Sequence, residues 1–168
     1  LSTGQCDIAL AGIGVTDERK SKMEFTTAYF DDNLAILVPK GSSITSAADL
    51  KGVSVGVQQA TSGETYATEN GAEVIQFEDT SLMFSALKTG QVKAVAANLS
   101  VISEALTNDP DSFKIAYQDS ENTEQIAAAV SPNNTALLTK ANATIARLKE
   151  TGELDQMKAK WVGTTSSA

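Results

Sequence analysis

Two short motifs contain the groups best suited to bind an anion. Arg19 ends the run Thr16-Asp17-Glu18-Arg19, and a planar guanidinium can hold a carboxylate through two parallel hydrogen bonds. Residues 61–64 (TSGE) have the composition of a helix start, where free backbone N–H groups and the helix dipole attract negative charge. Each motif therefore has groups that could bind an anion such as a carboxylate.

Each motif also has a purely structural explanation. Arg19 could be a surface residue paired with Asp17 or Glu18, because isolated charges usually lie on a solvated face. Thr61 and Glu64 have the spacing of a capping box, which stabilises a helix start without any ligand. Spacing alone leaves both explanations open.

The composition excludes several classes of protein. The chain has 168 residues, with 13 basic against 21 acidic side chains and a net charge of −8, which disfavours binding to nucleic acid or to an anionic membrane surface. It has no histidine, so hydrolases that use a histidine base and histidine-ligated zinc sites are excluded. Asp31-Asp32 lacks the spacing of a calcium loop and is expected to be solvated. We expect no catalytic residue, no cofactor and no metal.

The single cysteine and the aromatic residues are expected to pack in the interior. Cys6 cannot form an internal disulfide and lies in an apolar stretch, which predicts a buried thiol. Phe25, Tyr29 and Phe30 could line a pocket, but the core is the expected place for them. The chain opens with Leu1 instead of a signal peptide, and we expect a processed or truncated product.

The elements that must position the two motifs alternate between strand and helix. Apolar runs that end in glycine or proline predict strands at residues 7–13, 33–38, 53–57, 73–77, 94–97, 113–117 and 124–130. Capping residues and apolar spacing predict helices at 16–24, 64–70, 81–89, 101–107, 134–151 and 154–161. Between residues 53 and 117 the alternation describes parallel βαβ units, so the fold class is α/β.

Three runs of sequence resemble, in order, a family of polar amino-acid receptors of ABC importers, the extracellular solute-binding proteins of family 3. The runs are DIALAGIGVTDERKSKMEFTTAYFDDNLAILV, ADLKGVSVGVQQATSGETYA and NTALLTKANATIARLKETGELDQMKAKWVG. The resemblance covers almost the whole chain. It implies the two-lobed fold of type II periplasmic binding proteins, with a βα sandwich in each lobe.

The resemblance also implies how the chain is divided. Lobe 1 is expected to comprise residues 1–39 and 128–168, with Trp161 as an anchor, and lobe 2 residues 40–127. Two crossover strands, at 35–40 and 125–130, would be the hinges. Receptors of this family start with strands upstream of Leu1, so lobe 1 is expected to be incomplete, and its exposed sheet edge could pair or exchange strands with a second copy.

The residues of the binding site are carried over from the resemblance position by position. Arg19 aligns with the carboxylate clamp of the family. The other aligned ligand-binding positions are Ala11, Gly12 and Gly14 in lobe 1, and Thr61, Ser62, Gly63 and Asn98 in lobe 2. At two of them the chain departs from the family pattern.

Gly14 replaces a hydroxyl residue, so one hydrogen bond to the solute is expected to be lost. Asn98 replaces an aspartate that pairs with the ammonium group of an amino acid, and an amide supplies no charge for that cation. Asn98 could instead cap the helix that begins at Leu99. These departures suggest an atypical amino acid or another small carboxylate.

The resemblance implies a receptor that closes around its solute and presents it to a membrane permease. It also implies that the receptor works outside the cytoplasm, in the periplasm or on the surface of a Gram-positive cell. Two alternatives remain open, because one fold can support several functions. One is an enzyme similar to cyclohexadienyl dehydratases, although no acid or base stands out at the aligned positions. The other is the ligand-sensing domain of a signalling or regulatory protein.

Overall fold

The computed structural model describes residue 1 and residues 3–161, without the side chains of residues 121 and 122. The chain forms two compact units. Unit 1 combines residues 1–32 with the chain from residue 124 onward, and unit 2 consists of residues 33–123. Each unit has its own strands and helices, and both are of the α/β type that the sequence predicts.

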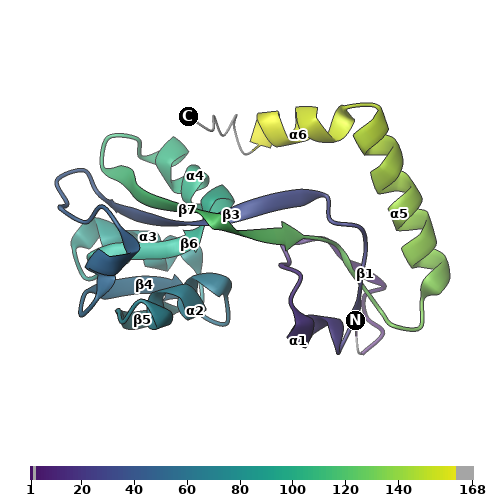
Figure 1. Cartoon of the computed structure of the whole chain (residues 1–168), viewed down its shortest axis with the longest axis horizontal. Helices are drawn as coiled ribbons and strands as arrows, with labels where there is room; N and C mark the ends of the chain where they lie inside the picture. Colours follow the sequence, from purple (N-terminus) through teal and green to yellow (C-terminus); the bar gives the residue numbers. More distant parts are fainter. Residues whose placement is uncertain (2, 162–168) are drawn as a thin grey trace. The chain divides into compact units, whose positions relative to one another are not determined.

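Unit 2 is built on a five-stranded sheet in the order β5-β4-β6-β3-β7 (Figure 1). The strands are β3 (Phe30–Pro39), β4 (Ser54–Gln58), β5 (Glu73–Phe77), β6 (Ala94–Asn98) and β7 (Phe113–Ile126). β4 pairs in parallel with β5 and β6, as the alternation of strands and helices predicts.

The long strand β3 changes the predicted topology of this sheet. β3 pairs antiparallel with β6 and lies between β6 and β7. The strand from Phe113, β7, therefore does not pair with β6 as the next strand of the parallel series, because β3 already occupies that edge of β6. Residues Leu34 to Leu37 of β3 pair with β6 inside unit 2, so this unit begins earlier in the chain than the predicted boundary after Pro39.

Helices cover both faces of this sheet because successive side chains of a strand point to opposite sides. Ile36 and Val38 pack in one core with Ala67 of α2 (Ser62–Glu69). Ala35 and Leu37 pack in a second core with α3 (Thr80–Thr89) and α4 (Leu99–Asn108). A short 3-10 helix, η1 (Ala47–Leu50), adds its last residue to the first core.

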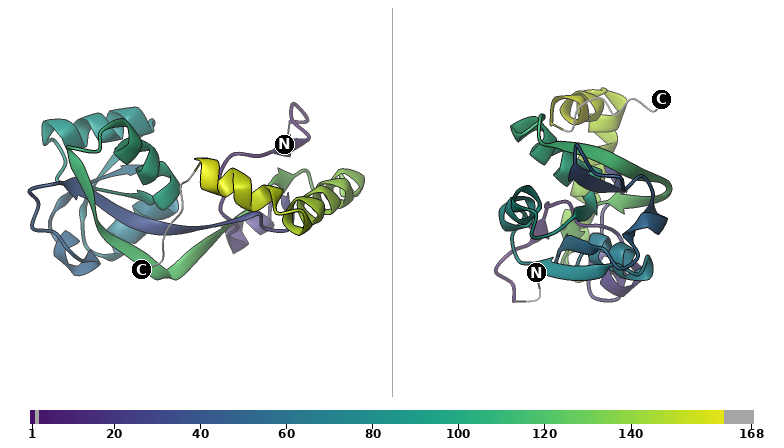
Figure 2. Two further views of the ribbon diagram at one scale, coloured as in Figure 1. Left: turned by 90° about the horizontal axis from the view of Figure 1, so that it is seen from above. Right: turned by 90° about the vertical axis from the view of Figure 1, so that its left-hand side faces the viewer.

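Unit 1 contains a small antiparallel sheet in the order β1-β8-β2. Its strands are β1 (Ile8–Ala9), β2 (Glu24–Phe25) and β8 (Ala129–Val130), and its helices are α1 (Asp17–Lys20), α5 (Thr135–Glu150) and α6 (Glu153–Trp161). Helices α5 and α6 contact each other (Figure 2). Gly152, with φ at 72°, makes the turn between them, as its place in the sequence suggests.

Two elements of unit 1 are shorter than predicted. Residues 7–13 form only the two-residue strand β1, since only Ile8 and Ala9 pair with β8. The helix expected at residues 16–24 ends at Lys20, and Glu24 and Phe25 pair with β8 instead. Tertiary pairing thus overrides the local preference of both segments.

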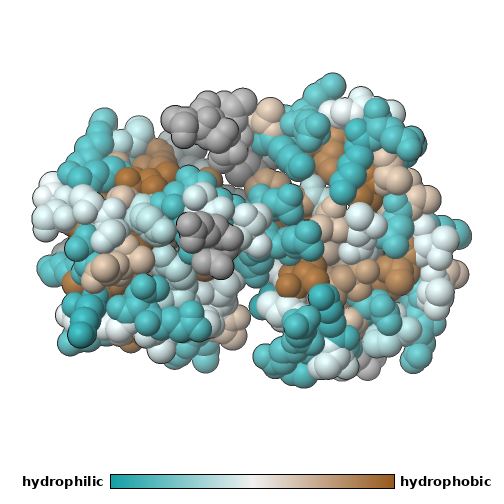
Figure 3. Space-filling view, in the orientation of Figure 1, coloured by the Kyte–Doolittle hydropathy of each residue, from teal (hydrophilic) through white to brown (hydrophobic). Residues whose placement is uncertain are grey.

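Three burial predictions, for Cys6, Trp161 and Asp32, require correction. Cys6 is exposed, because the residues before Ile8 join no strand in the described structure. Trp161 is 77% exposed and Met157 43%, since α6 buries Leu154 instead. Asp32 is buried, with 4% of its surface exposed, because it lies inside β3. Figure 3 shows apolar side chains, coloured brown, at several places on the visible surface.

Candidate functional site

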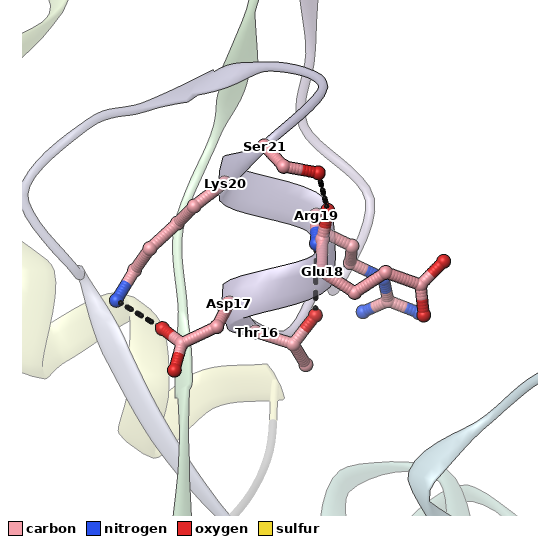
Figure 4. Close-up of polar contacts among 6 residues, drawn as sticks. All are labelled: Thr16, Asp17, Glu18, Arg19, Lys20 and Ser21. Carbon is pink, nitrogen blue, oxygen red and sulfur yellow. Dashed lines mark hydrogen bonds and ion pairs between the residues drawn. The ribbon is translucent and has the colours of Figure 1, made fainter.

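The short helix α1 brings Arg19 into position by local hydrogen bonds. Thr16 is its N-cap, and the Thr16 Oγ1 atom accepts a hydrogen bond from the backbone N–H of Arg19 at 3.2 Å (Figure 4). A threonine at this position stabilises a helix start by satisfying one of its unpaired N–H groups. The sequence motif around Arg19 therefore folds as predicted at its start.

The acidic neighbours of Arg19 pair with lysines. Asp17 forms an ion pair with Lys20 at 3.2 Å, and Glu18 forms one with Lys22 at 2.8 Å. The hydrogen bond from Lys22 is also the main reason why the pKa of Glu18 lies below its usual value, and the charge of Arg19 contributes less. The structural explanation of Arg19 as the partner of Asp17 or Glu18 does not hold.

The guanidinium of Arg19 is anchored on the main chain. Its Nη1 atom donates to the carbonyl oxygen of Gly14 at 2.9 Å, and the residue is half-buried. Arg19 forms no ion pair within the described residues. A guanidinium has five N–H donors in a fixed plane, so this one is oriented by Gly14 and keeps donors for an anion.

Gly14 is required for a reason that the sequence did not reveal. A Cβ atom at Gly14 would overlap the carboxylate of Glu124, so the side chain of Glu124 occupies the space that any larger residue would need. The structure thus adds a packing role to the predicted loss of a hydroxyl group. Of the other aligned positions in unit 1, Ala11 and Gly12 are exposed, and Gly12 has a φ of 55°, which favours glycine.

Glu124 was missed by the sequence analysis. No local motif marks it, because its contact with Gly14 depends on the pairing of two segments far apart in the chain. An isolated bridge joins Gly14 to Ile126, and the N–H of Val15 donates to the carbonyl of Gln125 at 2.8 Å. A glycine opposite an apolar strand was the one available signal, since glycine inside a strand often marks a close approach.

In unit 2, the start of α2 differs from the predicted capping box. Thr61 is the N-cap residue, but its hydroxyl donates to the carbonyl of Gln58 at 2.7 Å and makes no cap hydrogen bond to the helix. The Glu64 carboxylate accepts from the N–H of Ala60 at 2.7 Å. The predicted box is therefore wrong in both halves: the Thr61 hydroxyl binds the preceding turn, and Glu64 accepts from the N–H of Ala60 and not from that of the N-cap residue Thr61.

Gly63 places this helix start against the end of β6. A Cβ atom at Gly63 would overlap the carbonyl oxygen of Ala96 and lie 3.3 Å from the Cα atom of Ala97. Asn98, which follows directly, occupies the N-cap position of α4 but makes no side-chain cap hydrogen bond. Unit 2 thus brings Thr61, Gly63 and Asn98 to the same end of β6, and the capping explanation of Asn98 receives no support.

Other predicted features contribute less to a site. Phe25, Tyr29 and Phe30 are all half-buried, and burial raises the pKa of the Tyr29 hydroxyl. Within residues 1 and 3–161, no group of three or more acidic or cysteine side chains could hold a metal ion. Among the helices described, none combines the length and the apolar character that a bilayer crossing requires.

Comparison with known proteins identifies the family. The sequence matches the profile of the bacterial extracellular solute-binding proteins, family 3, over residues 1–164. The chain belongs to this family. The resemblance seen in the sequence and the predicted type II fold are both confirmed.

Two amino-acid-binding relatives are similar over nearly the whole chain. A probable histidine-binding protein of Neisseria gonorrhoeae is 29% identical over 96% of this chain, and the glutamine-binding protein GlnH of Bacillus subtilis is 29% identical over 96%. The chain spans 62% and 60% of the length of these two relatives.

Solved structures of amino-acid-binding proteins superpose closely on this chain. An ancestral arginine-binding protein bound to glutamine superposes with a TM-score of 0.87 at 34% identity, covering 96% of this chain and 73% of that one. The arginine-, lysine-, histidine-binding protein ArtJ of Geobacillus stearothermophilus has a TM-score of 0.88 at 29% identity, over 99% of this chain and 74% of that one.

Proposed function

We propose that the chain is the greater part of a solute-binding receptor that captures an amino acid or a similar small carboxylate for an ABC importer. The observation that carries the proposal is the guanidinium of Arg19, half-buried, anchored on the Gly14 carbonyl and without an ion pair in the described residues. The relatives' names support it, since they describe proteins that bind histidine, glutamine and arginine.

In the proposed mechanism, units 1 and 2 act as the two lobes and β3 and β7 as the crossover strands. The carboxylate of the solute binds Arg19 from lobe 1 and the helix start at Ser62 and Gly63 from lobe 2, where backbone N–H groups favour an anion. Ala11 and Gly12 supply main-chain contacts, and Thr61 and Asn98 supply side-chain oxygens. Binding of one group by both lobes would favour the closed form by population shift.

We further propose that the closed form is recognised by a membrane permease and that the protein works outside the cytoplasm, as the family description indicates for extracellular solute-binding proteins. Self-association through the sheet edge of unit 1 stays a prediction. Light scattering of the purified protein over a range of concentrations tests it.

The test of the binding role compares the two arginines of the chain. Arg19→Lys keeps the positive charge but cannot hold a carboxylate through two parallel hydrogen bonds. Arg147→Lys is the control, because Arg147 forms an ion pair with Glu153 at 3.0 Å that a lysine can also form. Calorimetry on the complete gene product with L-glutamine, L-arginine and L-histidine should show an affinity about 10- to 100-fold weaker for Arg19→Lys, from about 1.5–3 kcal/mol per charge-assisted bond. Undiminished binding would refute the role of Arg19.

We propose a receptor without catalytic turnover. An enzyme remains the second candidate, because an ancestral amino-acid-binding protein described as a precursor of cyclohexadienyl dehydratase has a TM-score of 0.85 at 26% identity. Such an enzyme needs a positioned acid or base, and the aligned residues of this chain are an arginine, an asparagine, two hydroxyl residues and small residues. Incubation with prephenate-like acids distinguishes the two, since turnover would contradict the receptor proposal.

A further inference from the structure

Strand pairing inside unit 1 brings the carboxylate of Glu124 against Gly14, whose carbonyl oxygen accepts from Arg19. Gly14 lies opposite Ile126, and the flanking hydrogen bonds from Val15 to Gln125 and from Ala127 to Ile13 measure 2.8 and 3.2 Å. Residues two apart on a strand point to the same face, so Glu124 and Ile126 share one. Glu124 is therefore the diagonal neighbour of Gly14 on that face.

Two side chains of opposite charge, Arg19 and Glu124, lie next to Gly14. The guanidinium of Arg19 donates to its carbonyl oxygen at 2.9 Å, and the carboxylate of Glu124 lies where its Cβ atom would be. Both charged side chains are half-buried, which strengthens their interaction with a charged ligand compared with fully exposed groups. Arg19 itself forms no ion pair in the described part of the chain.

We infer that Glu124 binds the α-ammonium group of the solute, so that unit 1 by itself recognises a zwitterion, with the carboxylate on Arg19 and the ammonium on Glu124. This inference rests on the proposed function. It also specifies the class of solute: an α-amino acid is favoured over a simple carboxylic acid, because the carboxylate of Glu124 supplies a negative charge for an ammonium group.

Gly14 has a defined part in this arrangement. Any side chain at residue 14 would overlap the carboxylate of Glu124 and displace it. The glycine thus makes room for the charge that the ammonium group needs. Substitution of Gly14 should have the same selective effect as substitution of Glu124.

The experiment measures selectivity between an amino acid and its deamino analogue, in which hydrogen replaces the ammonium group. The complete gene product is titrated by calorimetry with L-glutamine, L-arginine and the deamino analogue of each. The variants are Glu124→Gln, Gly14→Ala and, as a matched control, Glu150→Gln, which makes the same change at an exposed residue at the end of α5 in the same unit. Circular dichroism spectra confirm that each variant is folded.

Glu124→Gln and Gly14→Ala should weaken amino-acid binding about 10- to 100-fold and leave the affinity for the deamino analogue within about twofold, while Glu150→Gln changes neither. Equal weakening for both ligands would overturn the inference, because it would show a packing role. Unchanged amino-acid binding in Glu124→Gln would overturn it as well. If the wild-type protein binds neither amino acids nor deamino analogues, the proposed function fails, and that result is distinguishable because it appears before any variant is compared.

Discussion

Gly63→Ala is expected to destabilise unit 2 although alanine is the better helix former. Gly63 is buried in the first turn of α2, and an added Cβ atom would overlap the carbonyl oxygen of Ala96 and lie 3.0 Å from its carbonyl carbon. These atoms belong to the central strand β6, which pairs with β3 and β4. The strand cannot move aside without loss of ladder hydrogen bonds, so the helix start must shift.

The magnitude follows from two opposing effects. Excess volume in a packed interior costs about 1–3 kcal/mol, and a backbone neighbour places Gly63 in the upper part of that range. Replacing glycine by alanine in a helix recovers about 1 kcal/mol. The net loss in the free energy of unfolding is about 1–2 kcal/mol, which for a chain of this size lowers the melting temperature by about 2–8 °C.

Thermal denaturation followed by circular dichroism measures this effect. The matched control is Gly41→Ala, at an exposed glycine of the same unit where an added Cβ atom meets nothing within 4 Å. Gly41→Ala should be neutral or stabilising by about 0.4–1 kcal/mol, because alanine reduces the entropy of the unfolded chain. A melting temperature of Gly63→Ala equal to that of Gly41→Ala would refute the close contact between α2 and β6.

Two further predictions concern stability. The backbone N–H of Thr45 donates to the carboxylate of Asp49 and, with groups of Ser46, lowers the pKa of Asp49 below the ordinary 3.8. The stability that these hydrogen bonds contribute is present above pH 3.8 and is lost as the pH falls through the lowered pKa. Below about pH 4 the melting temperature of the wild type should therefore fall more steeply with pH than that of Asp49→Asn, and equal slopes would contradict this. Ala60 has a left-handed φ of 59°, so Ala60→Gly should raise the free energy of unfolding by up to about 1 kcal/mol, and a clear loss in urea denaturation would show that the strain is absent.

Much of unit 2 is predictable because its signals are local. Gly90, with φ at 78°, ends α3, and Asp79 caps its start by accepting the N–H of Ser81 at 2.7 Å. Apolar runs locate β4 and β6, which are buried in the sheet, and also β5, an edge strand whose residues are half-buried or exposed. The place of β3 was missed, since no residue of a strand specifies which neighbour it pairs with.

The residues of the candidate site were likewise predictable only where the signal is local. The motif around Arg19 was found from residue types and resemblance, and the cap at Thr16 follows from adjacent residues. The pairing of Asp17 and Glu18 with lysines decided that Arg19 is not a surface ion pair, and this required side-chain positions. The spacing of these residues in the sequence is compatible both with an ion-paired Arg19 and with a ligand-binding Arg19.

The sequence by itself determined the family, the α/β class, the order of most elements and the position of the arginine. These properties depend on residue types and on neighbours three or four positions apart, which a single chain displays directly. The tertiary structure alone decided that Asp32 is buried, that Cys6 and Trp161 are exposed, and that Glu124 lies against Gly14. Those features arise from contacts between segments distant in the chain, and no local signal in one sequence specifies which distant segments pair.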